Sequence, residues 1–146
     1  MTLSQIISDT LSAHGKVPGP YRIVIIELPR LARVLSRLLE MMGHQVETAD
    51  DGCSGVELVK SWEPHAVFSC IELPGLNGYE VAKEIRNSLP NKPLLVAHTS
   101  YGRWQIGERA KEAGFDILLT KPASIADLWR TLSLIEGTCD CEDLRL

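Results

Sequence analysis

Residues 67–80 read Val67-Phe68-Ser69-Cys70-Ile71-Glu72-Leu73-Pro74-Gly75-Leu76-Asn77-Gly78-Tyr79-Glu80, a short apolar run followed by a turn rich in Pro, Gly and Asn. Apolar runs of this length are typical of parallel strands that are buried on both faces. In open α/β sheets, ligand sites form at the carboxyl ends of such strands. We therefore expect Cys70 to stand at the mouth of a central strand, where functional chemistry would sit.

Strand and helix patterns alternate on both sides of this stretch. Apolar, β-branched runs predict further strands at 23–26, 45–49, 94–98 and 117–119. Apolar residues at helical spacing predict helices at about 29–42, 54–62, 79–88, 104–113 and 125–135. Parallel strands need crossover connections, so five strands that alternate with five helices predict an α/β fold, a parallel sheet with helices on both faces.

Local signals give these helices expected faces and ends. The first helix is predicted to have an apolar face formed by Leu31, Val34, Leu35, Leu38, Leu39 and Met42. Ser54 is expected to cap the second helix, and Ser124 with Asp127 to form a capping box for the last one. Gly43, Gly114 and Gly137 are predicted to end three of the helices.

The chain is predicted to hold one domain, residues 21–136, with a short segment at either end. Residues 1–20 carry an amphipathic helical pattern and then a Gly/Pro linker. That helix could pack on its own domain or fray, or it could serve as a docking or dimerisation helix. Residues 137–146 form a mostly polar tail, too short for a DNA-binding or enzymatic output domain.

Composition excludes several classes of protein. The 146 residues are 45% hydrophobic and carry a net charge of −4, with no basic run of the kind that nucleic-acid binding needs. No apolar stretch approaches the roughly 18 residues of a membrane span, and no signal peptide is apparent. No G-x-G-x-x-G or Walker-type loop follows the first strand. We expect a cytoplasmic protein that binds neither membrane nor nucleic acid.

The cysteines do not form a scaffold. Cys53, Cys70, Cys139 and Cys141 are too few and too irregularly spaced for a disulfide framework, and free thiols are expected in a reducing compartment. Their spacing also does not predict a structural metal site.

Three motifs, in order, resemble the CheY-like receiver domains of two-component response regulators and hybrid histidine kinases. They are Leu73-Pro74-Gly75-Leu76-Asn77-Gly78-Tyr79-Glu80, Thr99-Ser100-Tyr101-Gly102, and Ala113-Gly114-Phe115-Asp116 leading to Thr120-Lys121-Pro122. The resemblance spans Tyr21 to Glu136. It implies a flavodoxin-like sheet of strand order 2-1-3-4-5, which agrees with the alternation of strands and helices.

The resemblance also implies a phosphorylation pocket, and here the pocket departs from the family pattern. Thr99 and Lys121 match the family's Thr or Ser after the fourth strand and its Lys after the fifth. The family's acidic pair is Glu27-Leu28 here, its phospho-accepting Asp is Cys70, and its aromatic switch residue is Leu118.

These departures predict that the usual chemistry is lost. Transfer from phosphohistidine needs a carboxylate nucleophile and a divalent ion that neutralises the phosphoryl oxygens. Only Glu27 remains as a carboxylate ligand, and a thiol is a poor ligand for Mg²⁺. The backbone carbonyl of Glu72, a family metal ligand, cannot replace two lost carboxylates. We expect no aspartyl phosphorylation at this position, weak or absent Mg²⁺ binding, no other cofactor and no enzymatic activity.

The remaining pocket residues each allow two interpretations. Lys121 can pair with Glu27 or reach solvent, and Thr99 can be a switch or a hydrogen-bonded strand-end residue. Cys70 can be an inert space-filling residue or a redox sensor. Lys121 would lower the pKa of its thiol and Glu27 would raise it, so the sequence leaves the net direction open.

The leading hypothesis is a pseudo-receiver, a phosphorylation-incompetent receiver that acts by protein–protein interaction in two-component or phosphorelay signalling. Its partner would be a histidine kinase or another signalling protein, and a homodimer is a further possibility. Tyr101 and Trp104 are candidate interface anchors, although Trp104 could instead pack on its own helix. The alternatives are a thiol-based redox sensor through Cys70 and a phosphorelay receiver with an unusual acceptor, Ser69 or Glu72.

Overall fold

The structure, a computed structural model, describes residues 2, 5–9, 18–89, 93–137 and 142–146. Its strands are β1 (Arg22–Ile26), β2 (Gln45–Ala49), β3 (Ala66–Ser69), β4 (Leu94–Thr99) and β5 (Ile117–Thr120). Its helices are α2 (Pro29–Met41), α3 (Gly52–Trp62), α4 (Gly78–Ser88), α5 (Arg103–Ala113) and α6 (Ile125–Glu136). Strands and helices alternate along the chain, as predicted.

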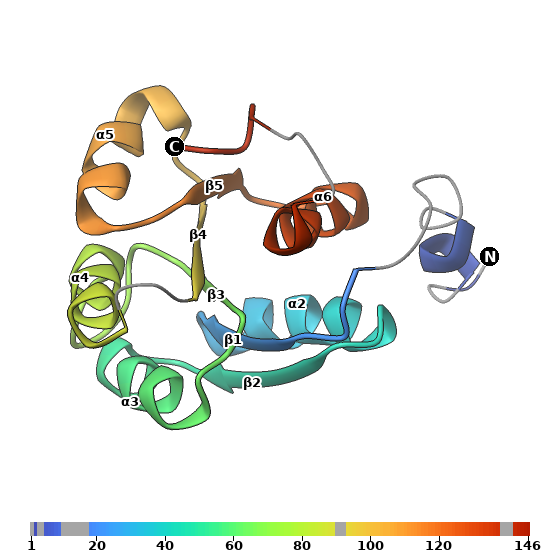
Figure 1. Cartoon of the computed structure of the whole chain (residues 1–146), viewed down its shortest axis with the longest axis horizontal. Coiled ribbons are helices and arrows are strands. Elements are labelled where there is room, and N and C mark those ends of the chain that lie inside the picture. Colours follow the sequence, from blue (N-terminus) through green and yellow to red (C-terminus); the bar gives the residue numbers. More distant parts are fainter. Residues whose placement is uncertain (1, 3–4, 10–17, 90–92, 138–141) are drawn as a thin grey trace.

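The five strands form one parallel sheet in the order β2-β1-β3-β4-β5, which confirms the predicted fold class and strand order (Figure 1). The register keeps the carboxyl ends of the inner strands nearly level. Ile26 lies opposite Ser69, which lies opposite Ala97, and Thr99 lies opposite Thr120. Residues that follow these strands therefore meet at one edge of the sheet.

Alternate residues of the sheet face two separate hydrophobic clusters. On β1, Ile23 and Ile25 belong to the cluster under α2 and α6, whereas Val24 and Ile26 belong to the cluster under α3, α4 and α5. The strands are apolar on both faces because helices cover both sides, which is why they appear in the sequence as continuous apolar runs.

The predicted inner face of the first helix was wrong in part. Leu31 and Val34 are 44% and 61% exposed, whereas Ala32, Leu35 and Leu39 are the buried residues of α2. Positions 32, 35 and 39 share one side of a helix, and Leu31 and Val34 each lie one residue earlier, about 100° around the axis. The apolar residues of α2 span more of its circumference than the sheet covers.

Helix ends mostly follow the predicted signals. The capping box of Ser124 and Asp127 is present, and Gly43, Gly114 and Gly137 all take positive φ angles at the ends of α2, α5 and α6. The predicted cap of α3 was wrong by three residues. Asp51 is the cap, and its carboxylate accepts hydrogen bonds from the Ser54 N–H and hydroxyl, both at 2.8 Å.

Both terminal segments contact the domain. In the N-terminal segment, residues 5–9 are helical and Ile7, 3% exposed, joins the cluster under α2 and α6. At the other end, residues 142–146 do not behave as a polar tail, because Leu144 is 8% exposed and belongs to the same cluster. Cys139 and Cys141 lie outside the described residues.

Candidate functional site

A cavity of about 160 Å³ opens at the carboxyl ends of β1, β3, β4 and β5. The fold brings together all five residues predicted for the pocket, because each follows or ends one of these strands. The cavity is lined by Glu27, Leu28, Cys70, Ile71, Glu72, His98, Thr99, Ser100, Tyr101 and Lys121.

Glu27 is the charged centre of this cavity. It is 1% exposed, and Lys121 Nζ lies 2.8 Å from its Oε2 atom. The two groups form an ion pair. The Leu28 N–H donates to Oε1 at 3.0 Å, so the side chain of Leu28 adds no polar group but its backbone does.

The environment of Glu27 keeps it ionised. Burial by itself raises the pKa of this carboxyl group, but interactions with the His98 and Lys121 side chains and with the Leu28 N–H outweigh burial and lower the pKa to about 2. The anion that pairs with Lys121 is thus the ionised carboxylate of Glu27, a group of the protein itself.

Cys70 is 4% exposed, and its thiol donates a hydrogen bond to the backbone carbonyl of Glu72 at 3.2 Å. Burial and then the negative charge of Glu27 raise the pKa of the thiol to about 12, and Lys121 offsets only part of this. The sequence left the direction of the Cys70 pKa shift open, and in the structure the pKa is raised. A thiol that remains protonated is a weak nucleophile, which weighs against thiol-based sensing at Cys70.

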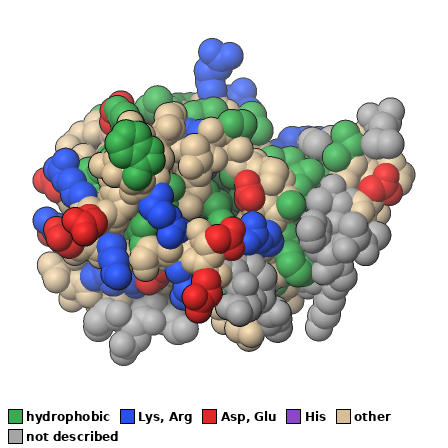
Figure 2. Space-filling model, turned by 90° about the horizontal axis from the view of Figure 1, so that it is seen from above, with side chains coloured by type: hydrophobic (Ala, Val, Ile, Leu, Met, Phe, Trp, Pro, Cys, Tyr) green, Lys and Arg blue, Asp and Glu red, His purple; other side chains and the backbone are tan. Residues whose placement is uncertain are grey.

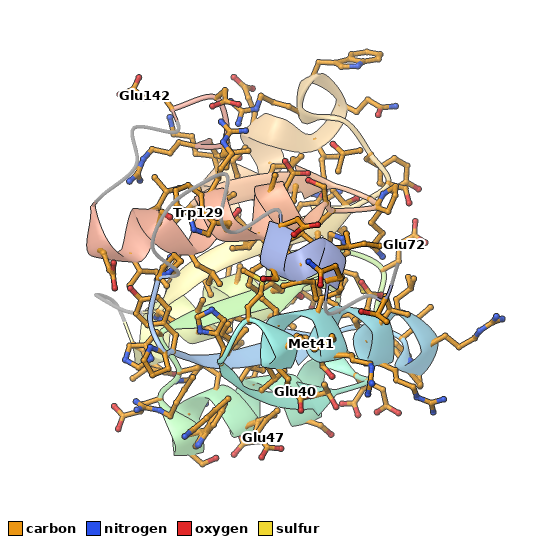
Figure 3. All side chains as sticks on the ribbon, turned by 90° about the vertical axis from the view of Figure 1, so that its right-hand side faces the viewer. Glu40, Met41, Glu47, Glu72, Trp129 and Glu142 are labelled. Atoms are coloured by element: carbon orange, nitrogen blue, oxygen red, sulfur yellow. The ribbon has the colours of Figure 1, made fainter. Side chains whose placement is uncertain are left out.

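Two loops are joined across the mouth of the cavity. The Tyr101 hydroxyl donates to Glu72 Oε1 at 2.8 Å, and the Tyr101 N–H donates to Thr99 Oγ1 at 3.1 Å. Figure 3 shows Glu72 on its loop at the side of the molecule, away from Trp129 on α6. Thr99, 3% exposed, thus serves as a hydrogen-bonded strand-end residue here.

His98 lines the cavity and was missed in the sequence. It is 6% exposed, its Nδ1 atom lies 3.6 Å from Glu27 Oε2, and neither ring nitrogen has a hydrogen-bond partner among the described residues. The available signal was a polar residue inside an otherwise apolar strand, directly before a site residue. The side chain of Glu72 was also missed as the partner of Tyr101, because the two residues are far apart in sequence.

Of Leu118, Ser69, Trp104 and Tyr101, only Tyr101 lines the cavity. Leu118, at the switch position, is 6% exposed within β5. Ser69 is 1% exposed, and its hydroxyl donates to the Cys70 carbonyl at 2.9 Å. Trp104 is 89% exposed at the start of α5, so it does not pack on its own helix. Tyr101, 42% exposed, lies nearby in the sequence.

The donor atoms of the cavity are a poor match for Mg²⁺, which prefers several hard oxygen ligands in octahedral geometry. Of the two lining carboxylates, Glu27 pairs with Lys121 and Glu72 bonds Tyr101. The Glu72 carbonyl accepts from the Cys70 thiol. Across the described residues, no group of three or more His, Cys, Asp or Glu could hold a metal ion.

Comparison with known sequences identifies one family. The pattern of the family described as "Response regulator receiver domain" matches residues 23–133. The transcriptional regulatory protein TcrA of Mycobacterium tuberculosis is 30% identical over 142 residues, 92% of this chain and 56% of that protein. Response regulator MprA of Mycolicibacterium vanbaalenii is 34% identical over 112 residues, 75% of this chain and 47% of that protein. The chain spans about half the length of these curated relatives.

Solved structures show the same fold. The receiver domain of the sensor histidine kinase PA1611 from Pseudomonas aeruginosa, described with a magnesium ion in its active site cleft, superposes with a TM-score of 0.73 at 26% identity, covering 82% of this chain and 99% of that one. A CheY-like receiver domain from Methylobacillus flagellatus gives a TM-score of 0.69 at 28% identity, covering 78% and 96%. No helix in the described part of the chain is long and apolar enough to cross a membrane.

Proposed function

The chain belongs to the family of response regulator receiver domains, the modules of two-component signalling, and we propose that within this family it is a pseudo-receiver. In this proposal the domain takes up no phosphoryl group, has no enzymatic activity, and signals by binding another protein. Membership of the family covers receivers in general, and the loss of phosphorylation is what we propose in addition.

The observation that carries the proposal is the ion pair between Lys121 and Glu27, 2.8 Å apart at the base of the cavity. The resemblance to receivers implies that this lysine contacts the phosphoryl group. Here its charge is already balanced by a buried carboxylate that belongs to the protein. An incoming phosphoryl group would have to displace that carboxylate, which is 1% exposed and lies against Lys121 and His98.

The chemistry at Cys70 supports the same proposal. Phosphoryl transfer from a phosphohistidine to a receiver uses a carboxylate nucleophile and a metal ion that neutralises the transferred group. Cys70 offers a protonated thiol, and that thiol hydrogen-bonds the Glu72 carbonyl, the atom that family members offer to the metal. We infer that Mg²⁺ binding is weak or absent.

The partner is proposed to be a protein, a histidine kinase or another signalling protein. Trp104 and Tyr101 are exposed aromatic residues; Tyr101 lines the cavity and bonds Glu72 and Thr99, and Trp104 follows three residues later at the start of α5. Figure 2 shows acidic and basic side chains interspersed with hydrophobic ones on the α5 side of the molecule, without one continuous basic surface. Because TcrA is named as a transcriptional regulatory protein, association with nucleic acid through other parts of a longer protein fits the same proposal.

The proposal is tested by phosphorylation with acetyl phosphate and Mg²⁺, read by intact mass. The native chain is expected to show no stable adduct of about 80 Da, the mass of one phosphoryl group. The matched control is the double variant Leu28→Asp with Cys70→Asp, which restores the family's carboxylates and is expected to take up one phosphoryl group. A stable adduct on the native chain that disappears in the single variant Cys70→Ala, or that maps to Ser69 or Glu72, would overturn the proposal.

A further inference from the structure

Residues 142–146 lie along the outer edge of β5, where the sheet would otherwise end (Figure 1). Arg145 pairs with Ile117 in an antiparallel bridge. Two hydrogen bonds flank this pair: the Leu118 N–H donates to the Leu144 carbonyl at 3.2 Å, and the Leu146 N–H donates to the Asp116 carbonyl at 2.9 Å. The segment therefore extends the parallel sheet by one short antiparallel piece.

The two leucines of this segment contact opposite layers of the domain. Leu144 is 8% exposed and joins the cluster under α2 and α6. Leu146 packs against the cluster under α3, α4 and α5, with its Cδ2 atom beside Gly107 of α5. The edge of β5 is thus lined by an apolar site for a leucine on each side of the sheet.

Asp143 is held by arginines from both helices that flank β5. Arg130 of α6 lies 2.6 Å from the Asp143 carboxylate, and Arg103 of α5 donates to the Asp143 backbone carbonyl at 2.8 Å. Arg130 lowers the pKa of Asp143, so the carboxylate stays charged. An open strand edge, two leucine sites and two arginines together recognise one pattern, Asp-Leu-x-Leu.

We propose that the β5 edge is a strand-addition site for this acidic–apolar pattern, filled in cis by residues 143–146, and that the same segment of a second copy of this chain can take their place. An unpaired strand edge is a template for pairing with another chain, and added strands gain affinity from main-chain bonds and specificity from side-chain pockets. The cis segment fits the site, so the identical segment of another copy fits it too.

The cis contact is weak enough to exchange. It consists of two backbone hydrogen bonds, one buried and one partly buried leucine, a hydrogen bond from Arg103 to the Asp143 carbonyl, and one exposed ion pair between Arg130 and Asp143. Exposed ion pairs contribute little, and short terminal segments open at low cost. What holds the segment in place is its covalent link, which supplies an effective concentration on the order of millimolar. Occupation of the β5 edge does not depend on the phosphorylation chemistry proposed for the cavity.

The first test titrates a synthetic peptide of residues 142–146, Glu-Asp-Leu-Arg-Leu, into isotopically labelled protein up to millimolar concentrations, with backbone amide shifts as the readout. In a variant lacking residues 142–146, and in full-length Leu144→Asp, the amides of Asp116 to Leu119 are expected to shift. The full native chain should need about ten times more peptide, because its own segment competes. Equal shifts in the native chain and the variants, or no shift at β5 in either variant, would overturn the cis-filled site.

The second test measures self-association by sedimentation equilibrium of the full chain. Association is expected, and it should be lost in Leu144→Asp and in the double variant Arg103→Gln with Arg130→Gln. The matched control, Lys111→Gln, removes a positive charge from the same helix α5 and should leave association unchanged. A native chain that stays monomeric at millimolar concentration, or an association that these variants do not alter, would refute exchange with a second copy.

Discussion

The ammonium group of Lys121 lies 2.8 Å from the carboxylate of Glu27, and the two partners differ in burial. The Glu27 side chain is 2% exposed, whereas that of Lys121 is 20% exposed. A lysine that loses its partner can extend into solvent, but a buried carboxylate that loses its partner cannot. This asymmetry gives the pair a measurable signature.

Lys121→Met is expected to destabilise the fold by about 3 to 5 kcal/mol, the usual cost of leaving one buried charge uncompensated. Glu27→Gln should cost clearly less, because Lys121 can move outward. The double variant should recover most of the loss caused by Lys121→Met. Urea unfolding of the three variants measures these differences. Equal losses in both single variants would show that the ion pair does not behave as a buried carboxylate with a mobile partner.

Glu27 also predicts how stability depends on pH. Its folded-state pKa of about 2 lies below the ordinary value of 4.5, so the unfolded chain binds the proton first as the pH falls. The contribution of Glu27 is therefore complete above about pH 4.5 and is lost as the pH falls from 4.5 towards 2. Unfolding free energies across this window should decline less steeply in Glu27→Gln than in the native chain. Parallel curves would contradict the assignment.

His44 predicts a second pH dependence of stability, at higher pH than that of Glu27. Burial lowers its pKa from 6.5 to about 4, and its Nδ1 atom accepts the Tyr21 N–H at 3.0 Å, which requires the neutral ring. The unfolded chain takes up this proton first, so stability should fall as the pH decreases from 6.5 to 4. In His44→Gln the slope in this window should disappear while the Glu27 window remains. Retention of the slope would assign it to another group.

Cys70 is expected to be nearly inert towards iodoacetamide at pH 8. Burial and the Glu27 charge raise its thiol pKa to about 12, whereas Cys53 is exposed at the start of α3. Peptide mapping over time should show Cys53 alkylated long before Cys70. In Glu27→Gln, Cys70 should react faster than in the native chain, because the repelling charge is gone. Comparable rates at Cys70 and Cys53 in the native chain would revive the redox-sensor hypothesis.

Trp104→Ala is expected to weaken binding of a protein partner without destabilising the fold. The side chain is 89% exposed, so its removal should change the free energy of unfolding by no more than about 0.5 kcal/mol. Capture of a signalling partner by immobilised protein should nevertheless fall, if Trp104 is an interface anchor. Trp129→Ala is the contrasting variant, since Trp129 packs against a core cluster and its loss should destabilise the fold. Unchanged capture with Trp104→Ala would remove this residue from the interface.

Much of the architecture follows from local patterns. Apolar runs, helical spacing and turn residues predicted the alternation of strands and helices, and a parallel sheet followed because parallel strands need crossover connections, which are usually helices. The resemblance to receiver domains implied the site residues as a set, and strand geometry explains why they meet, since residues after neighbouring parallel strands converge at one sheet edge. Thus Glu27, Cys70 and Lys121, far apart in sequence, could be placed in one pocket.

Other features depend on three-dimensional packing that no local pattern encodes. Periodicity marked Leu31 and Val34 as inward, but the rotation of α2 on the sheet left both exposed. The direction of the Cys70 pKa shift depended on burial and on how near the charges of Glu27 and Lys121 lie, and only the tertiary structure sets these. No sequence motif predicted that Leu144 would pair with the edge of β5. Sequence periodicity reports which side of an element is apolar, while tertiary packing sets what that side meets and at what distance.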